Sequence, residues 1–317
     1  MSDLLLCIDI GGSKLMTGLV EESGRVLASE RSEWRALTAQ SVMETILEAA
    51  HSLLGKNGNP RPAAIGVTIP GLADPKRGYW IEASFSGIRN LDIAPRLQRE
   101  FGVPAYIDND GQACALAERL FGVCRDTGDF LYLTVSNGVG GAVFVNDGIY
   151  YGAYGNAGEI GHCVVEENGR PCKCGSAGCL EMQASGRAVP LNYEKLGGEG
   201  GLSAKAIAQM ARAGNGTAQE TFALEGYYLG KAIAAACNLL NPAKVVIGGG
   251  VSLAFDLFEK PMRDTVRRFL YNGANSALVI LPTAFGDMGG LLGAAAVAMC
   301  GRKRLHNYAG AAESARE

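Results

Sequence analysis

Four side chains that bind zinc well fall within an eighteen-residue stretch: His162, Cys172, Cys174 and Cys179. One imidazole and three thiolates match the donors and the number that a closed tetrahedral zinc site requires. Buried free thiols fit poorly in a loop of Glu, Asn, Gly, Pro and Lys. A disulfide would leave one thiol over and would need an oxidising compartment. The spacing therefore predicts a structural zinc site, with the neighbouring Cys163 outside it.

Two acids flank this cysteine-rich loop, Glu159 before it and Glu181 after it. On an unconstrained surface they would be ordinary solvated charges. Held rigidly by a metal site, their carboxylates become acceptors for the hydroxyl groups of a polar ligand. We therefore expect the metal to act as scaffolding for the side chains around it.

A Gly-Gly turn directly after an apolar strand is the second pattern, at Asp9-Ile10-Gly11-Gly12-Ser13-Lys14. Backbone N–H groups that point outward from such a turn, with the hydroxyl of Ser13, suit a phosphate. Asp9 could hold a water of Mg²⁺. The segment is neither a P-loop nor a dinucleotide fingerprint, and a plain hairpin turn is the alternative.

Two further glycine segments follow apolar strands in the second half of the chain. Ser136 to Gly141, which includes Asn137 and Gly138, repeats the order of strand, glycine turn and strand. Gly248 to Gly250 offers another place for close backbone approach, with a helix-packing turn as its alternative. One such hairpin in each half predicts a duplicated α/β architecture with a cleft between two lobes.

Three polar residues, Asp108-Asn109-Asp110, come between a buried strand and a helix that runs to Phe121. One of them can cap the helix, but a cap needs only one side chain. An aspartate there can accept the proton of a substrate hydroxyl. An ordinary Asp pKa of about 3.9 makes it a weak base. That is sufficient for phosphoryl transfer, which depends mainly on positioning.

Hydrophobic periodicity places these motifs on strands and helices. We expect buried strands at 4–10, 63–69, 103–107, 130–135 and 244–247, and a strand at 277–281. Apolar residues at helical spacing predict a helix capped by Thr38, and later helices at 91–101, 203–213, 217–240, 253–270 and 288–299.

The composition bounds the class of protein. At 317 residues the chain is longer than a domain with a single hydrophobic core usually is, so we expect two domains. A net charge of −3 leaves no electrostatic footprint for nucleic acid or an anionic membrane. No apolar run reaches the roughly 18 residues of a membrane span. Nine cysteines, mostly inside apolar runs, fit a reducing compartment, so we expect a cytoplasmic protein.

With these motifs in view, the sequence resembles the ROK family of bacterial sugar kinases and related repressors over essentially the whole chain. Its first glycine turn looks like the family's first phosphate motif, and Asn109-Asp110 looks like its sugar and catalytic pair. Gly155 to His162 (GNAGEIGH) and Cys172 to Glu181 (CKCGSAGCLE) look like its signature and its zinc motif.

The resemblance implies an α/β, two-domain actin-like ATPase fold of the hexokinase and Hsp70 type, with ATP and sugar in the cleft. We expect a small domain at 1–118, completed by a C-terminal helix at 287–317, and a large domain at 119–286 that carries the zinc motif.

The resemblance also implies roles for individual residues. Asp110 would be the base that takes the sugar hydroxyl proton, and Gly71 would let the sugar approach the backbone. His162 would bind zinc through one ring nitrogen and the sugar through the other. The other residues expected to hold sugar hydroxyls are Asn109, Glu159 and Glu181. The residues expected to bind ATP with Mg²⁺ are Asp9, Gly11, Gly12, Ser13, Lys14, Asn137, Gly138, Gly248, Gly249 and Gly250.

Two segments depart from the family's pattern. Ser136-Asn137-Gly138 stands where the family usually has Gly-Thr-Gly, although the amide of Asn137 can still donate a hydrogen bond. Ala83 to Ile88 stands where the family often has a Pro-Asn-Leu-Pro-Gly-Trp-like run, so an asparagine contact to the sugar is missing or replaced by Ser84 or Asn90. The departures concern the identity of the hexose and the affinity for nucleotide.

We therefore expect an ATP-dependent kinase that phosphorylates the 6-hydroxyl of glucose or of an N-acylhexosamine such as N-acetylmannosamine. A sugar-responsive repressor of the same family would need about 60 to 80 residues of DNA-binding module before the first phosphate motif, which begins here at residue 9. A non-catalytic sugar-binding protein fits poorly with the retained phosphate turns. The expected partners are a hexose and ATP, without nucleic acid or membrane, in a homodimer that the resemblance implies.

Overall fold

The computed structural model describes residues 3–12, 14–83, 86–271, 275 and 277–303. Ser13 and Ser84 lie outside these ranges. The chain divides into two compact units, which are called the first and the second unit below. The first unit comprises Met1–Gly128, Phe144–Ala157 and Met288–Glu317, and the second comprises Asp129–Val143 and Gly158–Asp287.

The first unit is built on a mixed sheet with the strand order β3-β2-β1-β4-β8. Its strands are β1 (Leu4–Ile10), β2 (Lys14–Glu21), β3 (Val26–Glu33), β4 (Ala64–Ile69) and β8 (Ala105–Asn109). β1 pairs antiparallel with β2 and parallel with β4, which pairs parallel with β8. The central strands β1 and β4 are nearly continuous apolar runs because both faces of the sheet are covered. The edge strand β3 alternates between half-buried and exposed residues.

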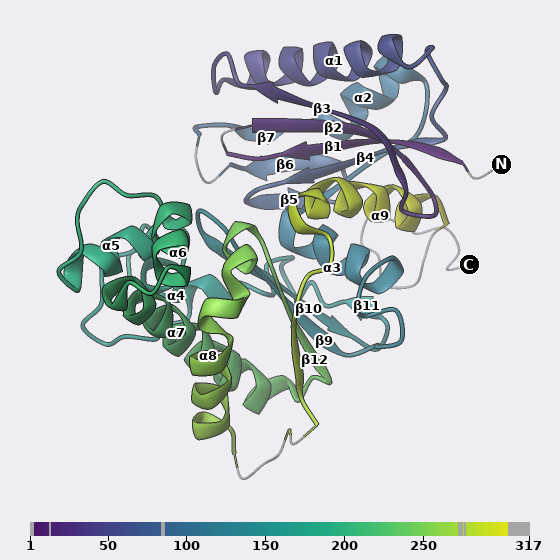
Figure 1. Ribbon diagram of the computed structural model, residues 1–317. Coiled ribbons are helices and arrows are strands. Elements are labelled where there is room, and N and C mark those ends of the chain that lie inside the picture. The colour runs from purple at the N-terminus through teal and green to yellow at the C-terminus, as the bar shows by residue number, and fades with distance from the viewer. Residues whose placement is uncertain (1–2, 13, 84–85, 272–274, 276, 304–317) are drawn as a thin grey trace. The chain divides into compact units, whose positions relative to one another are not determined.

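Helices cover both faces of this sheet (Figure 1). The helices α1 (Ala39–Lys56) and α2 (Ile93–Phe101) pack on one face and share its apolar core. Thr38 caps α1 as predicted, since its Oγ1 accepts the N–H of Ser41 at 3.2 Å. The helices α3 (Asp110–Leu120) and α9 (Gly289–Lys303) lie on the other face. The backbone of α9 comes so close to β4 that a Cβ at Gly66 would lie 1.8 Å from the carbonyl oxygen of Ala294.

A small antiparallel sheet, which the sequence analysis missed, follows Gly71. Its strands are β5 (Leu72–Asp74), β6 (Tyr79–Glu82) and β7 (Arg89–Leu91). The fully buried Trp80 donates its indole N–H to the carbonyl oxygen of Pro70 at 2.9 Å. This bond fixes the end of β4, where the polypeptide turns at Gly71.

A second mixed sheet has the strand order β11-β10-β9-β12-β13. Its strands are β9 (Phe130–Val135), β10 (Val139–Val145), β11 (Gly148–Ile149), β12 (Lys244–Gly248) and β13 (Val279–Pro282). β12 lies parallel to both β9 and β13, and the boundary between the two units falls within β10. The predicted second hairpin is therefore present as β9, β10 and β11.

The second unit is rich in helices. They are α4 (Leu180–Gln183), α5 (Ala188–Lys195), α6 (Ala204–Arg212), α7 (Gly216–Leu240) and α8 (Phe255–Phe269). Short 3₁₀ turns lie at Ile160–His162, Gly250–Ala254 and Gly286–Met288. The turn before α8 makes that helix begin two residues later than predicted, and α4 and α5 were not predicted. α7 and α8 pack so closely that a Cβ at Gly226 would lie only 2.6 Å from the carbonyl oxygen of Phe258.

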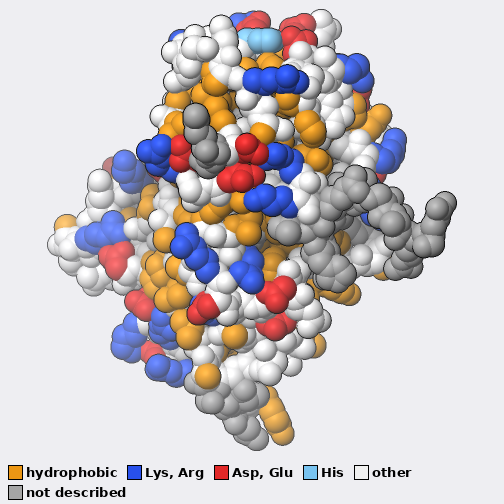
Figure 2. Space-filling model, turned by 90° about the vertical axis from the view of Figure 1, so that its right-hand side faces the viewer, with side chains coloured by type: hydrophobic (Ala, Val, Ile, Leu, Met, Phe, Trp, Pro, Cys, Tyr) orange, Lys and Arg blue, Asp and Glu red, His pale blue; other side chains and the backbone are white. Residues whose placement is uncertain are grey.

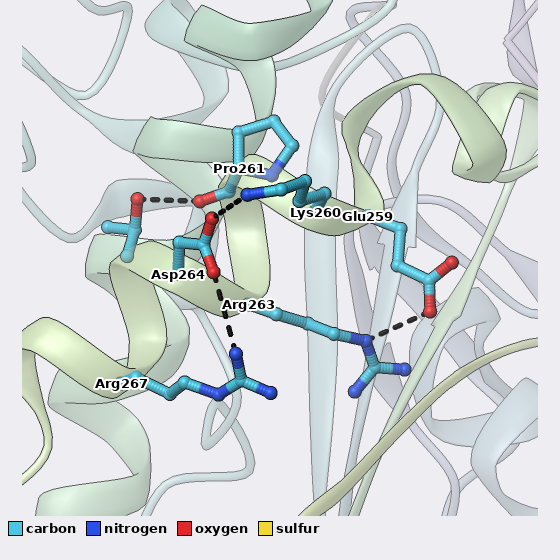
Figure 3. Close-up of polar contacts among 7 residues, drawn as sticks. Glu259, Lys260, Pro261, Arg263, Asp264 and Arg267 are labelled. Carbon is cyan, nitrogen blue, oxygen red and sulfur yellow. Dashed lines mark hydrogen bonds and ion pairs between the residues drawn. The ribbon is translucent and has the colours of Figure 1, made fainter.

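The outer face of α8 carries charged side chains paired along the helix (Figure 3). Arg263 meets Glu259 at 2.9 Å and Lys260 meets Asp264 at 2.6 Å, each four residues apart. Arg267 lies 3.5 Å from the other oxygen of Asp264. Such exposed pairs each contribute only a few tenths of a kcal/mol, so α8 is held mainly by its apolar face against α7.

The face drawn in Figure 2 carries acidic and basic side chains close to one another, with apolar side chains between them. Mixed charge of this kind produces no large field of one sign on that face. Among the described residues, no helix combines the length and the apolar character that crossing a membrane requires.

Candidate functional site

Three polar side chains lie in a row where the parallel strands of the first unit end. In the strand register Asp9 of β1 is opposite Thr68 of β4, and Thr68 is opposite Asp108 of β8. The carboxyl ends of parallel strands meet at one edge of the sheet, where α/β proteins bind ligands. The fold of the first unit thus brings the Asp9 motif and the Asp108-Asn109-Asp110 motif to the same edge.

Asp9 is held in a closed polar environment at this edge. Its Oδ1 accepts the hydroxyl of Thr68 at 2.7 Å, and a Cβ at Gly290 of α9 would lie 2.2 Å from its Oδ2. Burial raises the pKa of Asp9, while the Thr68 hydrogen bond and the charge of Lys14 act in the opposite direction. A partly buried carboxylate of this kind is suited to a nearby cation, which would favour its ionised form.

The first glycine turn differs in one respect from its prediction. The N–H of Gly11 does not point outward, because it donates to the carbonyl oxygen of Lys14 at 2.9 Å within the hairpin. The carbonyl oxygen of Gly11 in turn accepts the indole N–H of Trp34 at 3.0 Å. Gly12, which follows, is exposed. Of these two glycines, Gly12 therefore remains the candidate for a phosphate contact.

Asn109 is the helix cap that the polar triplet was expected to contain. Its Oδ1 accepts the N–H of Gly111 at 2.9 Å, and its Nδ2 donates to the carbonyl oxygen of Gly71 at 2.9 Å. Gly71 has a φ of +87°, a conformation that glycine adopts without strain. Asp110 opens α3, and its Oδ1 accepts the N–H of Gly111 at 2.8 Å. Asn109 thus links Gly71 to the start of α3, where Asp110 lies.

Asp108 is fully buried behind this pair. Its Oδ2 accepts the hydroxyl of Tyr151 at 2.6 Å, and its Oδ1 accepts the N–H of Asn109 at 2.8 Å. Burial raises the pKa of Asp108 to about 7, although both hydrogen bonds act to lower it. The sequence analysis did not single out Tyr151, since nothing local marks it among the residues after β11.

The four predicted zinc ligands of the second unit come together. The candidate ligand atoms of His162, Cys172, Cys174 and Cys179 all lie within 4.8 Å of one another. The Nδ1 of His162 is 3.7 Å from the Sγ of Cys172, and the Sγ atoms of Cys174 and Cys179 are 3.6 Å apart. Zn–S bonds of about 2.3 Å in a tetrahedron place two sulfur atoms about 3.8 Å apart, so these separations fit a zinc ion.

Arg170 anchors the loop that carries these ligands through hydrogen bonds. Its Nε donates to the carbonyl oxygen of Met182 at 2.6 Å, and its Nη2 donates to the Oδ1 of Asn192 at 2.9 Å. The fully buried Glu225 of α7 lies near this guanidinium, and burial raises the pKa of Glu225 well above its usual range. Sequence reasoning missed Arg170, which links the loop to α4 and α5.

The two ring nitrogens of His162 have different neighbours. Nδ1 faces the thiols, whereas Nε2 lies 3.9 Å from the Oε2 of Glu159. Both side chains are substantially exposed, at 39% and 53%. Nε2 and the Glu159 carboxylate together form a polar pair on the surface of the second unit.

Glu181 contacts the second glycine turn directly. Its Oε2 accepts the N–H of Val139 at 3.1 Å, and its Oε1 lies 3.8 Å from Nη2 of Arg187. A Cβ at Gly138 would lie 2.3 Å from that Oε2, so the turn needs glycine there to admit the carboxylate. Cys179 is the N-cap residue of α4, the helix that carries Glu181. The loop of predicted zinc ligands is therefore joined to the turn through the side chain of Glu181.

A cavity of about 790 Å³ lies beside this turn, entirely within the second unit. Its walls come from the second glycine turn, from α5 and α6 and from the 3₁₀ turn after β12. The residues that line the cavity include Asn137, Arg187, Pro190, Ala208, Gly250 and Val251. The volume lies in the range of small-molecule and cofactor sites.

The Gly248 to Gly250 segment reaches this cavity only at its end. A Cβ at Gly248 would lie 1.9 Å from the hydroxyl of Tyr132, and Gly249, at φ +81°, lies against the backbone of Val135. The absence of side chains at these two positions allows close packing within the second unit. Gly250 has open space at its Cβ position and lines the cavity.

Comparison with known proteins gives consistent matches along the chain. The model of the ROK family matches residues 5–300. A glucokinase from Halalkalibacterium halodurans is 30% identical over 311 residues, which cover 89% of this chain and 92% of the relative. The DNA-binding transcriptional dual regulator NagC of Escherichia coli (strain K12) is 34% identical over 246 residues, or 74% of this chain and 61% of the regulator.

A solved structure agrees with these sequence matches. The ROK family glucokinase from Streptomyces griseus, in complex with glucose and AMPPNP, is 29% identical and superposes with a TM-score of 0.84. The match covers 93% of this chain and 99% of that chain. Together with the sheets and helices described above, this similarity confirms the predicted two-domain, actin-like α/β fold.

Proposed function

Because the chain belongs to the ROK family, we propose that it is an ATP-dependent hexose kinase that transfers the γ-phosphate to a sugar hydroxyl. One observation carries the proposal on the structural side. The second unit holds a cavity large enough for a nucleotide, and residues from two of the predicted phosphate segments, Asn137 and Gly250, line it. The glucokinase relatives support the same class of reaction.

We assign the nucleotide to this cavity with its adenine end on the apolar wall and its phosphates at the second glycine turn. The apolar side chains of Pro190, Ala208 and Val251 suit an adenine ring and its ribose. Asn137 and Gly138 of the turn, with Gly250, then lie where the phosphates are expected. Gly12 and Lys14 of the first unit, with Ser13, are assigned to the same phosphates. Asp9 would hold Mg²⁺ through a water molecule. The ion would neutralise part of the negative charge on the phosphates, so the protein would have less of that charge to stabilise.

The sugar is assigned to the polar groups around Asp110. In the reaction, the sugar oxygen forms a bond to the γ-phosphorus as the bond from that phosphorus to the bridging oxygen breaks, and ADP leaves. The carboxylate of Asp110 takes the hydroxyl proton. Residues assigned to hold the other hydroxyls are Gly71, Ser84, Asn109, Glu159, His162 and Glu181.

We also propose that His162, Cys172, Cys174 and Cys179 bind a structural zinc ion. When bound, zinc would fix the ring of His162 and the start of α4, and so hold Glu181. All four ligands come from the protein, which leaves no open position for a catalytic water. We place the protein in the cytoplasm, where such thiols stay reduced, and propose a homodimer on family resemblance.

The hexose is proposed to be glucose or an N-acylhexosamine such as N-acetylmannosamine, phosphorylated at the 6-hydroxyl. Glucokinases of 28 to 30% identity favour glucose. The similarity to the regulator NagC supports a second candidate function, a sugar-responsive regulator, in which the same site would bind sugar without transferring phosphate.

A coupled assay of ADP formation across a panel of hexoses tests the proposal. Glucose, mannose, N-acetylglucosamine and N-acetylmannosamine are each offered with MgATP, and the products are identified by mass and by the position of the phosphate. We expect one or two of these sugars to give a 6-phosphate. Sugar binding by calorimetry without ADP formation would favour the regulator, and neither binding nor turnover would reject both.

A further inference from the structure

Arg187 has a position that neither the glycine motifs nor the zinc motif explains. It immediately precedes α5 and lines the cavity of the second unit together with Asn137 and Gly186. Its side chain is 58% exposed, so burial does not account for its presence. The interactions around its guanidinium indicate a role.

One side of this guanidinium is fixed by the second glycine turn. Its Nε donates to the carbonyl oxygen of Asn137 at 2.6 Å, and its Nη2 lies 3.8 Å from the position of a Cβ on Gly138. The backbone of the turn is held too, since Gly186 donates its N–H to the carbonyl oxygen of Ser136 at 2.6 Å. The planar group is therefore oriented before any ligand arrives.

The remaining donors of Arg187 are available. Within the described residues, no hydrogen bond engages its Nη1 or Nη2, and its nearest carboxylate is that of Glu181, with an N–O distance of 3.8 Å. An exposed pair at that separation contributes little to stability. A second arginine of the same cavity differs: Arg212 meets both oxygens of Asp256, at 2.6 and 3.0 Å.

We propose that Arg187 is a ligand of the terminal phosphates of the nucleotide. This inference rests on the proposed function, because it assigns the nucleotide to the cavity. Nε stays on the turn while the Nη donors contact the β- or γ-phosphate at the Asn137 end. Two N–H groups in one plane match two phosphate oxygens, a geometry that lysine cannot reproduce. Arg187 thereby adds a positive charge where the turn itself supplies only backbone dipoles.

Calorimetric titration of the full chain with adenosine, AMP, ADP and MgATP tests the proposal. For wild type we expect affinity to rise with the number of phosphates. In Arg187→Met, affinity for adenosine and AMP should stay within about twofold, while that for ADP or MgATP should fall about 10- to 100-fold, as expected when a hydrogen bond to a charged group is lost. Arg187→Lys should lie between the two.

Arg267→Met is the matched control. It removes an arginine of the same unit whose Nη1 lies 3.5 Å from Asp264, and it should leave all four affinities unchanged. An equal loss for adenosine and MgATP in Arg187→Met would mean that Arg187 only shapes the cavity wall, and unchanged MgATP affinity would mean no contact; either result overturns the inference. A wild-type chain that binds none of the four ligands would instead reject the nucleotide site itself.

Discussion

Tyr151 donates its hydroxyl to a carboxylate that is completely excluded from solvent, the Oδ2 of Asp108, at 2.6 Å. Asp108 in turn accepts the N–H of Asn109, the residue that caps α3 and precedes Asp110. The segment assigned to catalysis is therefore supported by a buried acid. Because burial raises the pKa of that acid to about 7, its protonation changes near neutral pH.

This pKa predicts a pH dependence of stability. The unfolded chain binds its proton with a pKa near 3.8, whereas the folded chain binds it up to about pH 7. Between these values the folded state holds more protons, so the free energy of unfolding should fall as pH rises from 4 to 7 and level off above. The full difference is at most about 4 kcal/mol, since each pKa unit corresponds to about 1.4 kcal/mol.

Asp108→Asn isolates this contribution because it keeps the shape and removes the charge. The difference between its free energy of unfolding and that of wild type (variant minus wild type), measured by urea at several pH values, should increase from pH 4 to pH 7 and then level off. A difference that is constant over this range would show that Asp108 does not titrate there.

Asp110→Asn should slow phosphoryl transfer strongly. The amide oxygen can still accept the N–H of Gly111, so the start of α3 should be unchanged, but an amide cannot take the hydroxyl proton. We expect kcat to fall about 10²- to 10⁴-fold, the usual contribution of a general base. Rates of ADP formation measure the loss, and calorimetry with the sugar and metal analysis should give wild-type values.

Asp264→Asn is the control for this change, since it removes an exposed carboxylate of α8 that meets Lys260. It should leave kcat unaltered. If Asp110→Asn kept full activity, another group would have to accept the proton, and the assignment of the base would be rejected.

The sequence predicted those parts of the fold that local patterns encode. The apolar run of β1 ends at a polar turn, and Thr38 precedes a helical repeat of apolar residues, so both elements could be placed from neighbouring residues. The sheet of β5, β6 and β7 could not, because strands of three or four residues are too short to show a period. The buried Trp80 that anchors it appears in the sequence only as an isolated aromatic residue.

The residues of the site also fall into those that a local sequence pattern identifies and those that only the packing of the chain brings together. The four predicted zinc ligands lie close together in the sequence, so their side-chain chemistry was enough to single them out, and the structure brings them together. The bonds from Tyr151 to Asp108 and from Val139 to Glu181 join residues 43 and 42 positions apart. Their formation depends on how strands and helices pack, which no local pattern contains. Arg187 was missed for that reason, since its role follows from the position of the cavity.

Removal of zinc should loosen the second unit without abolishing chemistry. A structural zinc site can supply on the order of 10 kcal/mol of local folding free energy. A zinc chelator, or Cys174→Ser, should therefore lower the unfolding temperature and raise the KM for sugar, because His162 and Glu181 lose their support. The KM for ATP should change less. Metal analysis, thermal unfolding and steady-state kinetics measure the three effects.

Cys163→Ser provides the comparison for this experiment. Cys163 adjoins His162 and is exposed, but its thiol is not among the clustered ligand atoms. Its replacement should leave zinc content, unfolding temperature and KM at wild-type values. A fully active and equally stable protein without bound zinc would contradict the proposed scaffolding role.

Gly138→Ala should weaken sugar binding through Glu181. The new methyl group would lie 2.3 Å from the Oε2 of Glu181, and the carboxylate can move away only by giving up the N–H of Val139. The cost to folding should stay small because a flexible side chain yields. Loss of a hydrogen bond to a charged acceptor corresponds to a rise of about tenfold or more in the KM for sugar.

Gly216→Ala is the matched substitution, since no atom lies within 4 Å of its Cβ position at the start of α7. It should leave the KM for sugar unchanged and should not destabilise the protein. Glu181→Gln in the Gly138→Ala background should add little further, because both changes act on one contact. If Gly138→Ala raised the KM for ATP but not that for sugar, the turn would still bind phosphate, but Glu181 would have no part in holding the hexose.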